Sequence, residues 1–191
     1  MGDIPTQMIS RLIPRYGEPH RRYHTWAHIG ACFDAAEKIS DDRSLEVALA
    51  IFYHDAIYDP FKNDNEVRSA VLLMDEGERA RLDPAVLEKA RGMILATKHD
   101  VCPETEQERV VVDADLSILG ADAATFDRYE DEIRQEYSIV PEEVFAAGRT
   151  KVMQGFLGRE HIFATERARN LWEAKARENI GRSLRRWGGS S

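Results

Sequence analysis

The chain has 191 residues, of which 43% are hydrophobic and 31% are charged. This length and balance predict one domain, spanning residues 1–191, with a hydrophobic core, and they exclude an intrinsically disordered chain. The net charge of −8 argues against polymeric nucleic acid as a partner, because such binding neutralises several phosphates with lysine and arginine. We expect a small ligand instead. It can be phosphorylated, because a metal and one or two arginines suffice locally.

The sequence shows neither a membrane segment nor a secretory signal. No apolar stretch reaches bilayer length, and the N-terminus lacks a basic region followed by an apolar core and a cleavage site. Cys32 and Cys102 are too few for a disulfide framework and lack the paired spacing of a zinc knuckle. We therefore expect a cytoplasmic protein that does not contact membranes. A homo-oligomer is compatible with the sequence.

Apolar residues recur at spacings of three and four along most of the chain, which predicts an all-α fold of about eight or nine helices. Breaks fall at Asp59-Pro60, Asp83-Pro84 and Val140-Pro141, where proline limits the helix, and at Gly120, which is typical of a helix C-terminus. The predicted helices span residues 4–15, 25–40, 43–58, 64–82, 84–98, 105–119, 122–138, 141–157 and 163–187.

The dipeptide His54-Asp55 lies in a run from Ala48 to Tyr58 that is apolar on every face of the predicted helix. A buried carboxylate needs a cation or a hydrogen-bonded charge pair, and a divalent metal is the sharper of these two interpretations. The second copy of the dipeptide, His99-Asp100, closes a helix instead of lying within one. Predicted burial therefore separates the two copies.

Two further segments place polar groups among apolar residues. His24 and His28 are four residues apart, and the helical face of His28 continues through small and apolar side chains, so His28 is expected to point inward. The alternative is a core histidine bonded to a carbonyl. Asp113 and Asp115 lie about 200° apart around a helix, so at most one can face a given centre. For either aspartate the alternative is a helix cap or an arginine partner.

Histidine and aspartate on three buried segments together favour a divalent metal site with nitrogen and oxygen donors. Such donors suit Mn, Fe, Co, Ni, Zn or Mg, and the open positions would take water and substrate.

The order His, then His-Asp, then Asp on separate helices resembles the HD-domain superfamily of metal-dependent phosphohydrolases. Tyr23-His-Thr-Trp-Ala-His28 is similar to the Tyr-His-Asn-x-x-His signature of cyclic nucleotide phosphodiesterases, and Ala114-Asp-Leu-Ser117 to their Ala-Asp-Leu-Ser. The whole pattern most resembles a bacterial group of predicted metal-dependent HD phosphohydrolases. This resemblance implies an HD-like helical bundle, with His24 as proton donor to the leaving group. It also implies the metal ligands His28, His54, Asp55 and Asp115.

The chain also departs from these relatives. Thr25 replaces the asparagine of the phosphodiesterase signature, and no purine-selecting glutamine region is evident, so cyclic nucleotide specificity does not carry over. The His-Asp-x-x-Glu-Asp string of guanosine tetraphosphate hydrolases is matched by His54 to Asp59, with Tyr58 in place of the glutamate. Asp59 is thus a candidate base or water-positioning group, or equally a helix-end residue before proline.

His99 ends an apolar helix and is a candidate phosphate ligand, second-metal donor or proton donor; the alternative is an exposed histidine at a helix end. Candidates for substrate binding or support of the site are Arg22, Glu66, Arg68 and Lys98, although charged helical residues usually form a solvated face.

Together these residues predict hydrolysis of a small, nucleotide-like phosphate ester or phosphoanhydride by metal-activated water. The main alternative is a non-catalytic domain that keeps the metal as a structural staple and senses a ligand or pairs with a partner. A redox enzyme ranks third, because it would need a second metal and further histidine ligands.

Overall fold

The computed structural model describes residues 4–189, and within this range it confirms the all-α class, with nine α-helices, one short 3₁₀ helix and no strand. The helices are α1 (Thr6–Tyr16), α2 (Trp26–Ile39), α3 (Leu45–Tyr53), α4 (Asn65–Arg79), α5 (Pro84–Ala96), α6 (Glu106–Leu116), η1 (Ser117–Gly120), α7 (Ala123–Glu136), α8 (Glu142–Leu157) and α9 (Glu166–Trp187).

The third predicted helix, residues 43–58, is too long, because α3 ends at Tyr53. The Nδ1–H group of His54 donates to the carbonyl of Ile51 at 2.9 Å. In a longer helix, a backbone amide of the next turn would need this same carbonyl as its acceptor. The Oγ atom of Ser69 then accepts the backbone N–H of Ile57. His54 and Asp55 therefore lie in a buried turn after the helix and not inside it.

The helix α4 ends in a Schellman motif built on a residue other than glycine. Arg81 adopts φ of 58°, and the amides of Arg81 and Leu82 donate to the carbonyls of Glu78 and Gly77. This C-cap stops the helix at Arg79, before the predicted end at residue 82. The other predicted helices agree with the structure to within a few residues at each end.

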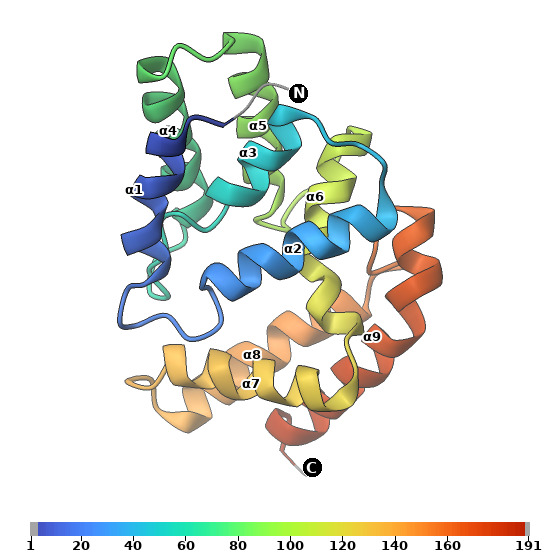
Figure 1. Cartoon of the computed structure of the whole chain (residues 1–191). Helices are drawn as coiled ribbons and strands as arrows, with labels where there is room; N and C mark the ends of the chain where they lie inside the picture. Colours follow the sequence, from blue (N-terminus) through green and yellow to red (C-terminus); the bar gives the residue numbers. More distant parts are fainter. Residues whose placement is uncertain (1–3, 190–191) are drawn as a thin grey trace.

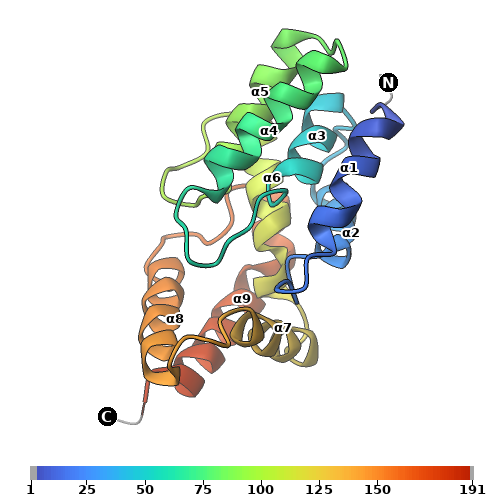
Figure 2. The same ribbon diagram turned by 90° about the vertical axis from the view of Figure 1, so that its left-hand side faces the viewer.

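The helices form two groups that meet along α2 and α6. Figure 1 shows α1, α3, α4 and α5 above α2, and α7, α8 and α9 below it. Figure 2, turned by 90°, shows α6 passing from the upper group toward α7 and α9. The helix α2 packs on α6, and α3 packs on α5. The C-terminal ends of α3, α5 and α6 thereby come together beside the first turn of α2.

The core is continuous around this junction. Its largest fully buried side chains include Tyr16, Ile29, Leu49, Tyr53 and Phe126, which come from α1, α2, α3 and α7. The polar residues among them each need a partner, because a buried polar group without one costs free energy. Within residues 4–189, no helix has the length and apolar character that crossing a bilayer requires.

Candidate metal centre

Four predicted metal ligands from three parts of the chain come together at this junction. His28 lies in the first turn of α2, His54 and Asp55 follow α3, and Asp115 is in the last turn of α6. The two histidine Nε2 atoms are 3.1 Å apart. Asp55 Oδ2 lies 3.3 Å from His28 Nε2 and 3.1 Å from His54 Nε2, and Asp115 Oδ1 lies 3.3 and 3.6 Å from the same two atoms.

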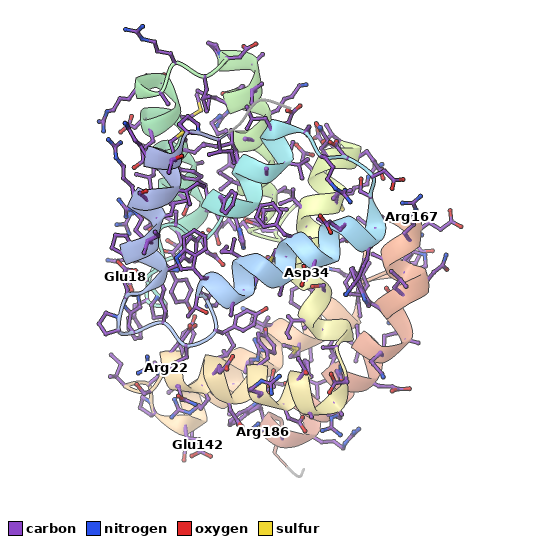
Figure 3. The ribbon with its side chains drawn as sticks, viewed as in Figure 1. Glu18, Arg22, Asp34, Glu142, Arg167 and Arg186 are labelled. Carbon is purple, nitrogen blue, oxygen red and sulfur yellow. The ribbon has the colours of Figure 1, made fainter. Side chains whose placement is uncertain are left out.

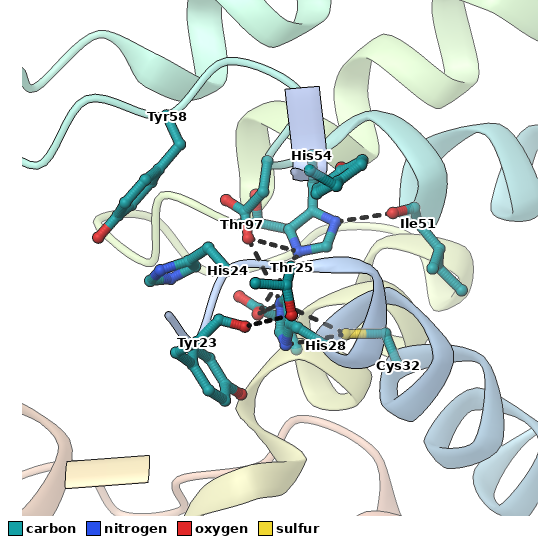
Figure 4. Close-up of polar contacts among 12 residues, drawn as sticks. Tyr23, His24, Thr25, His28, Cys32, Ile51, His54, Tyr58 and Thr97 are labelled. Carbon is teal, nitrogen blue, oxygen red and sulfur yellow. Dashed lines mark hydrogen bonds and ion pairs between the residues drawn. The ribbon is translucent and has the colours of Figure 1, made fainter. Parts of the chain in front are cut away.

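These spacings fit a shared cation. Ligand atoms about 2.0–2.2 Å from one ion in tetrahedral geometry are separated by about 3.3–3.6 Å. The Nδ1–H of His54 is occupied by the carbonyl of Ile51, which leaves the lone pair of Nε2 facing the cluster. Figure 4 shows the rings of His28 and His54 directed at each other. Two imidazole nitrogens and two carboxylates therefore converge where a positive charge is needed.

The electrostatics of the cluster point to the same need. Burial alone would raise the pKa of Asp55 and Asp115, but hydrogen bonds and charges from the neighbouring histidines hold both pKa values well below the usual range. Burial alone would lower the pKa of His28 and His54. The neighbours of His28 (Cys32 and Tyr23, then both aspartates) and the two aspartates beside His54 instead raise these pKa values well above the usual value. A cation bound at the centre would supply the positive charge that the two carboxylates attract.

Cys32 also belongs to the buried cluster. From the sequence, this cysteine was expected only as part of the apolar stripe that continues the face of His28. His28, Cys32, His54 and Asp115 each offer a ligand atom within 4.8 Å of the others, so this group could hold a metal ion. However, the sulfur lies 3.7 Å from Nδ1 and 3.6 Å from Nε2 of His28. Because it is equally distant from both nitrogens, it flanks the imidazole and does not extend the line of the Nε2 lone pair. Asp55 is the better placed donor.

The two aspartates of α6 have different partners, as their angular separation predicts. Asp115 faces the cluster, whereas Asp113 is fully buried and points to the loop before α9. The oxygens of Asp113 accept the backbone N–H groups of Ala164 and Thr165, each at 2.7 Å. Asp113 thus takes the capping role that was the alternative for either aspartate.

His99 lies beside the cluster through an unusual backbone conformation. It adopts φ of 61° in the turn after α5, a region that side chains other than glycine seldom occupy. Its Nε2 is 2.9 Å from Asp115 Oδ2, the carboxylate oxygen that does not face His28. Arg159 holds the turn by donating to the carbonyl of His99 at 2.7 Å. His99 is therefore placed to orient Asp115.

His24 lies next to the cluster without being part of it, as Figure 4 shows between Tyr58 and the paired imidazoles. Its Nδ1 is 2.7 Å from Glu136 Oε2, and Tyr58 donates its hydroxyl to the same oxygen at 2.7 Å. The His24 ring also stacks on Tyr58, with 4.1 Å between centroids. Because Glu136 binds Nδ1 of His24, the other ring nitrogen, Nε2, is available to a ligand.

Glu136 has no local sequence signal, because it ends a charge-rich helix in a region where no motif is evident. In the structure its side chain is buried, and its Oε1 accepts three consecutive backbone N–H groups, of Arg22, Tyr23 and His24. Burial would raise the pKa of Glu136, but the hydrogen bond and charge of His24 and the amide donors lower it to about 2.

Arg21 is a second residue without a distinguishing sequence pattern. Its guanidinium is buried and donates to the carbonyls of His24, Asp55 and Ala56. It therefore joins the segment of His24 to the turn of the His-Asp dipeptide. Only a three-dimensional structure reveals this role, since a buried arginine in a loop follows no periodicity.

The remaining predicted residues divide into two locations. Glu66 lies near the cluster: burial and the charge of Asp55 raise its pKa, while Lys98 and His99 oppose that shift. Lys98 itself is half-exposed and pairs with Asp100 at 2.8 Å. By contrast, Asp59 lines a separate cavity, where its Oδ1 caps its own turn by accepting the Phe61 N–H. Arg22 lines both that cavity and another one that reaches His28.

The cluster is open on its carboxylate side. The side chains of His28 and His54 are 1% and 2% exposed, whereas those of Asp55 and Asp115 are 16% and 20% exposed. His24 and His99 are exposed to a similar degree as the carboxylates. The carboxylates, with His24 and His99 beside them, are therefore the most solvent-accessible part of the cluster.

Comparison of the chain with family models, with curated proteins and with solved structures finds no match. The geometry of the residues themselves therefore carries the functional argument.

Proposed function

We propose that this protein is a metal-dependent phosphohydrolase of the HD type, with His28, His54, Asp55 and Asp115 as the ligands of one divalent ion. The observation that carries the proposal is the convergence of two imidazole nitrogens and two carboxylates at 3.1–3.6 Å, on an edge open to solvent. A closed shell of side chains would favour a structural staple instead.

The donor set also supports the choice of metal and substrate class. Neutral nitrogen and anionic oxygen donors suit Mn, Fe, Co, Ni or Zn better than a thiolate site would, and Mg is compatible with the carboxylates. When bound, such an ion supplies Lewis-acid polarisation and an activated water. We propose a small, nucleotide-like phosphate ester or phosphoanhydride as substrate, since His24 and His99 lie beside the exposed carboxylates and their ring nitrogens can bond to phosphate oxygens.

His24 would act on the leaving group. Glu136 fixes its Nδ1, so its Nε2–H would donate a proton to the departing oxygen, and the carboxylate would stabilise the imidazolium before transfer. His99 would keep Asp115 oriented through its 2.9 Å hydrogen bond. Glu66, on the same side of the cluster, would hold a water or a substrate hydroxyl.

The test is metal analysis of the protein as purified, followed by a phosphate-release screen over nucleotides, alarmones and generic phosphate esters. Each reaction is supplied with Mn, Mg, Co, Ni, Fe or Zn. The proposal expects at least one stoichiometric metal and phosphate release that disappears in Asp115→Ala. Bound metal without release from any substrate would instead favour a ligand-sensing domain.

A further inference from the structure

A second cavity, of about 620 Å³, borders the contact between Tyr58, Glu136 and His24 but contains none of the four predicted metal ligands. This volume is in the range of sites for small organic ligands. Figure 3 shows Glu18 and Arg22 of its wall below α1, beside the loop that leads into α2. Other walls come from the loop after Tyr58 and the end of α7.

Apolar and aromatic groups are unusually exposed in this cavity. Phe61 is 54% exposed and Ile139 is 79% exposed, and both line it. The rings of His20 and Tyr58 lie nearly parallel, at an interplanar angle of 9° and 6.2 Å between centroids. The Tyr58 ring already has His24 and the Arg21 guanidinium against it, so Phe61 and the half-exposed His20 are the surfaces that can stabilise a planar ring by stacking and by removing apolar area from water.

Three arginines line the same cavity, and few carboxylates lie close enough to pair with their charges. Arg15 and Arg22 have no carboxylate within ion-pair distance in residues 4–189, and Arg68 has only the exposed Asp64, at 3.9 Å. One terminal nitrogen of Arg22 donates to the carbonyls of Pro19 and Arg21, which anchors the guanidinium. The other N–H groups of Arg22 can then donate to a ligand.

The acids of the cavity wall are already engaged. Glu18 pairs with the buried Arg21 at 3.0 Å, and Asp59 accepts the Phe61 amide. Both oxygens of Glu136 accept hydrogen bonds from the His24 segment and Tyr58. A ligand entering the cavity therefore meets three arginines together with three carboxylates, each of which already accepts at least one hydrogen bond or ion pair.

We propose that this cavity binds a small ligand that joins a planar aromatic ring to a phosphate-type anion, such as a nucleoside monophosphate. The ring would lie against Phe61 and His20, and the anion would take arginine N–H donors, which match phosphate oxygens in geometry. The proposal goes beyond hydrolysis, because it needs neither the metal nor a reaction.

Occupancy of the cavity would be sensed at the metal centre. Tyr58 lines the cavity and stacks on His24, and Glu136 lines it and binds His24 Nδ1. A ligand that restrains Tyr58 would therefore restrain the His24 ring, through contacts already present.

The experiment measures binding of adenosine 5′-monophosphate to the full chain by titration calorimetry, with and without a chelator. The double variant Arg22→Gln, Arg68→Gln should bind at least about tenfold more weakly, and Phe61→Ala should weaken both this nucleotide and adenosine. Inorganic phosphate should respond to the arginine variant only. The control is Arg167→Gln, an exposed arginine paired with Asp41 and shown by Figure 3 far from Glu18 and Arg22.

The chelator separates this proposal from the proposed hydrolysis. Binding that survives chelation and persists in Asp115→Ala supports the cavity, even if no phosphate is ever released. Binding that needs the metal, or that the arginine and Phe61 variants leave unchanged, would place the nucleotide at the metal cluster and overturn the proposal. The side chains of Arg22, Phe61 and Arg68 are exposed, so we expect these variants to fold and the binding result to be interpretable.

Discussion

At the scale of single residues, the angular position of an aspartate around α6 decides which groups it binds. Asp113 and Asp115 have the same side chain and apolar neighbours in sequence, yet one accepts two loop amides and the other faces two imidazoles. The helix separates them by about 200°, so neither can replace the other. The pair therefore offers a matched comparison of a structural aspartate with one proposed to bind metal.

We predict that His28→Ala, His54→Ala, Asp55→Ala and Asp115→Ala each remove most of the bound metal, because each deletes a converging donor. Asp113→Ala and Asp100→Ala should retain it. Metal content per folded protein, measured by plasma emission spectrometry after desalting, checks this. Full occupancy in the Asp55 and Asp115 variants would refute the assignment.

Cys32 provides a sharper test of the same ligand set. Its sulfur flanks the His28 ring, so Cys32→Ala should keep the metal while Asp55→Ala loses it. Co²⁺ substitution distinguishes the two donors, since a thiolate ligand adds strong near-ultraviolet charge-transfer absorption. Such absorption in the wild-type protein, absent in Cys32→Ala, would show that the cysteine is a metal ligand, contrary to this prediction.

The role of His24 is predicted from its partner. If the protein hydrolyses phosphate esters, His24→Ala should keep the metal and lower turnover by roughly a hundredfold or more, as loss of a general acid does. A nitrophenyl phosphate should lose much less, because its leaving oxygen needs no proton. The comparison of kcat for good and poor leaving groups checks this, and equal losses would assign His24 to phosphate binding.

At the scale of elements, Glu136 fastens the end of α7 to the segment before α2. Its carboxylate collects amides from residues 22–24, more than a hundred residues away in sequence, together with the Tyr58 hydroxyl. Tertiary hydrogen bonds to a charged, buried acceptor of this kind are costly to break. The segment that carries His24 thereby depends on α7 for its position.

We predict that Glu136→Gln lowers the free energy of unfolding by roughly 3 kcal/mol at neutral pH, because each pKa unit is worth about 1.4 kcal/mol. The pKa of Glu136 is about 2 in the folded protein and near 4.5 when unfolded. Its stabilisation is therefore complete above the unfolded value and disappears as pH falls toward the folded one. Urea unfolding at pH 7, 4.5 and 3 should show the difference between wild type and variant shrinking. A constant difference would contradict it.

The sequence was sufficient for the helices but not for all of their ends. Periodicity predicts the existence of all nine α-helices, and Val110 to Val112 are helical despite their strand-like composition. The predicted end of α3 was wrong by several residues. The His54 side chain donates to the carbonyl of Ile51, and Arg21 donates to the carbonyls of Asp55 and Ala56, so the helix does not continue. Tertiary partners such as Arg21 cannot be read from a local window.

The candidate site was predictable to the extent that its residues interrupt apolar runs. His28, His54, Asp55 and Asp115 do so, and the structure brings them together. Glu136 lies in a helix rich in charge, where one more glutamate carries no signal. Arg22 and Asp59 interrupt nothing apolar either, and the cavity that they share with Phe61 exists only through the fold.

At the scale of the whole molecule, the proposed metal cluster lies at the junction of the two helical groups. The α2 helix, the turn after α3 and the end of α6 would each contribute at least one ligand, so an ion there would bridge elements that also meet through apolar packing and the hydrogen bonds of Arg21. Removing the ion would leave two carboxylates close together without that positive charge. Folding stability and metal binding should therefore be thermodynamically linked.

We predict that a chelator lowers the melting temperature of the wild-type protein by roughly 5–10 °C, since ligand at a hundred times its Kd adds about 2.7 kcal/mol and each kcal/mol is worth about 2–4 °C at this size. The shift should grow from pH 6 to pH 8. Protons compete with the metal at His28 and His54, whose raised pKa values keep them charged without it. Differential scanning calorimetry of matched apo and metal-loaded samples checks this.

The two aspartate variants are the controls for that shift. Asp115→Ala should melt at the same temperature with and without chelator, because it has no ion to lose. Asp113→Ala should melt lower than wild type, since it leaves two buried amides without an acceptor at a cost of roughly 2–4 kcal/mol, yet it should still respond to the chelator. A chelator response in Asp115→Ala equal to that of wild type would mean that the stabilising ion binds elsewhere, and the cluster at the helical junction would then lose its proposed role.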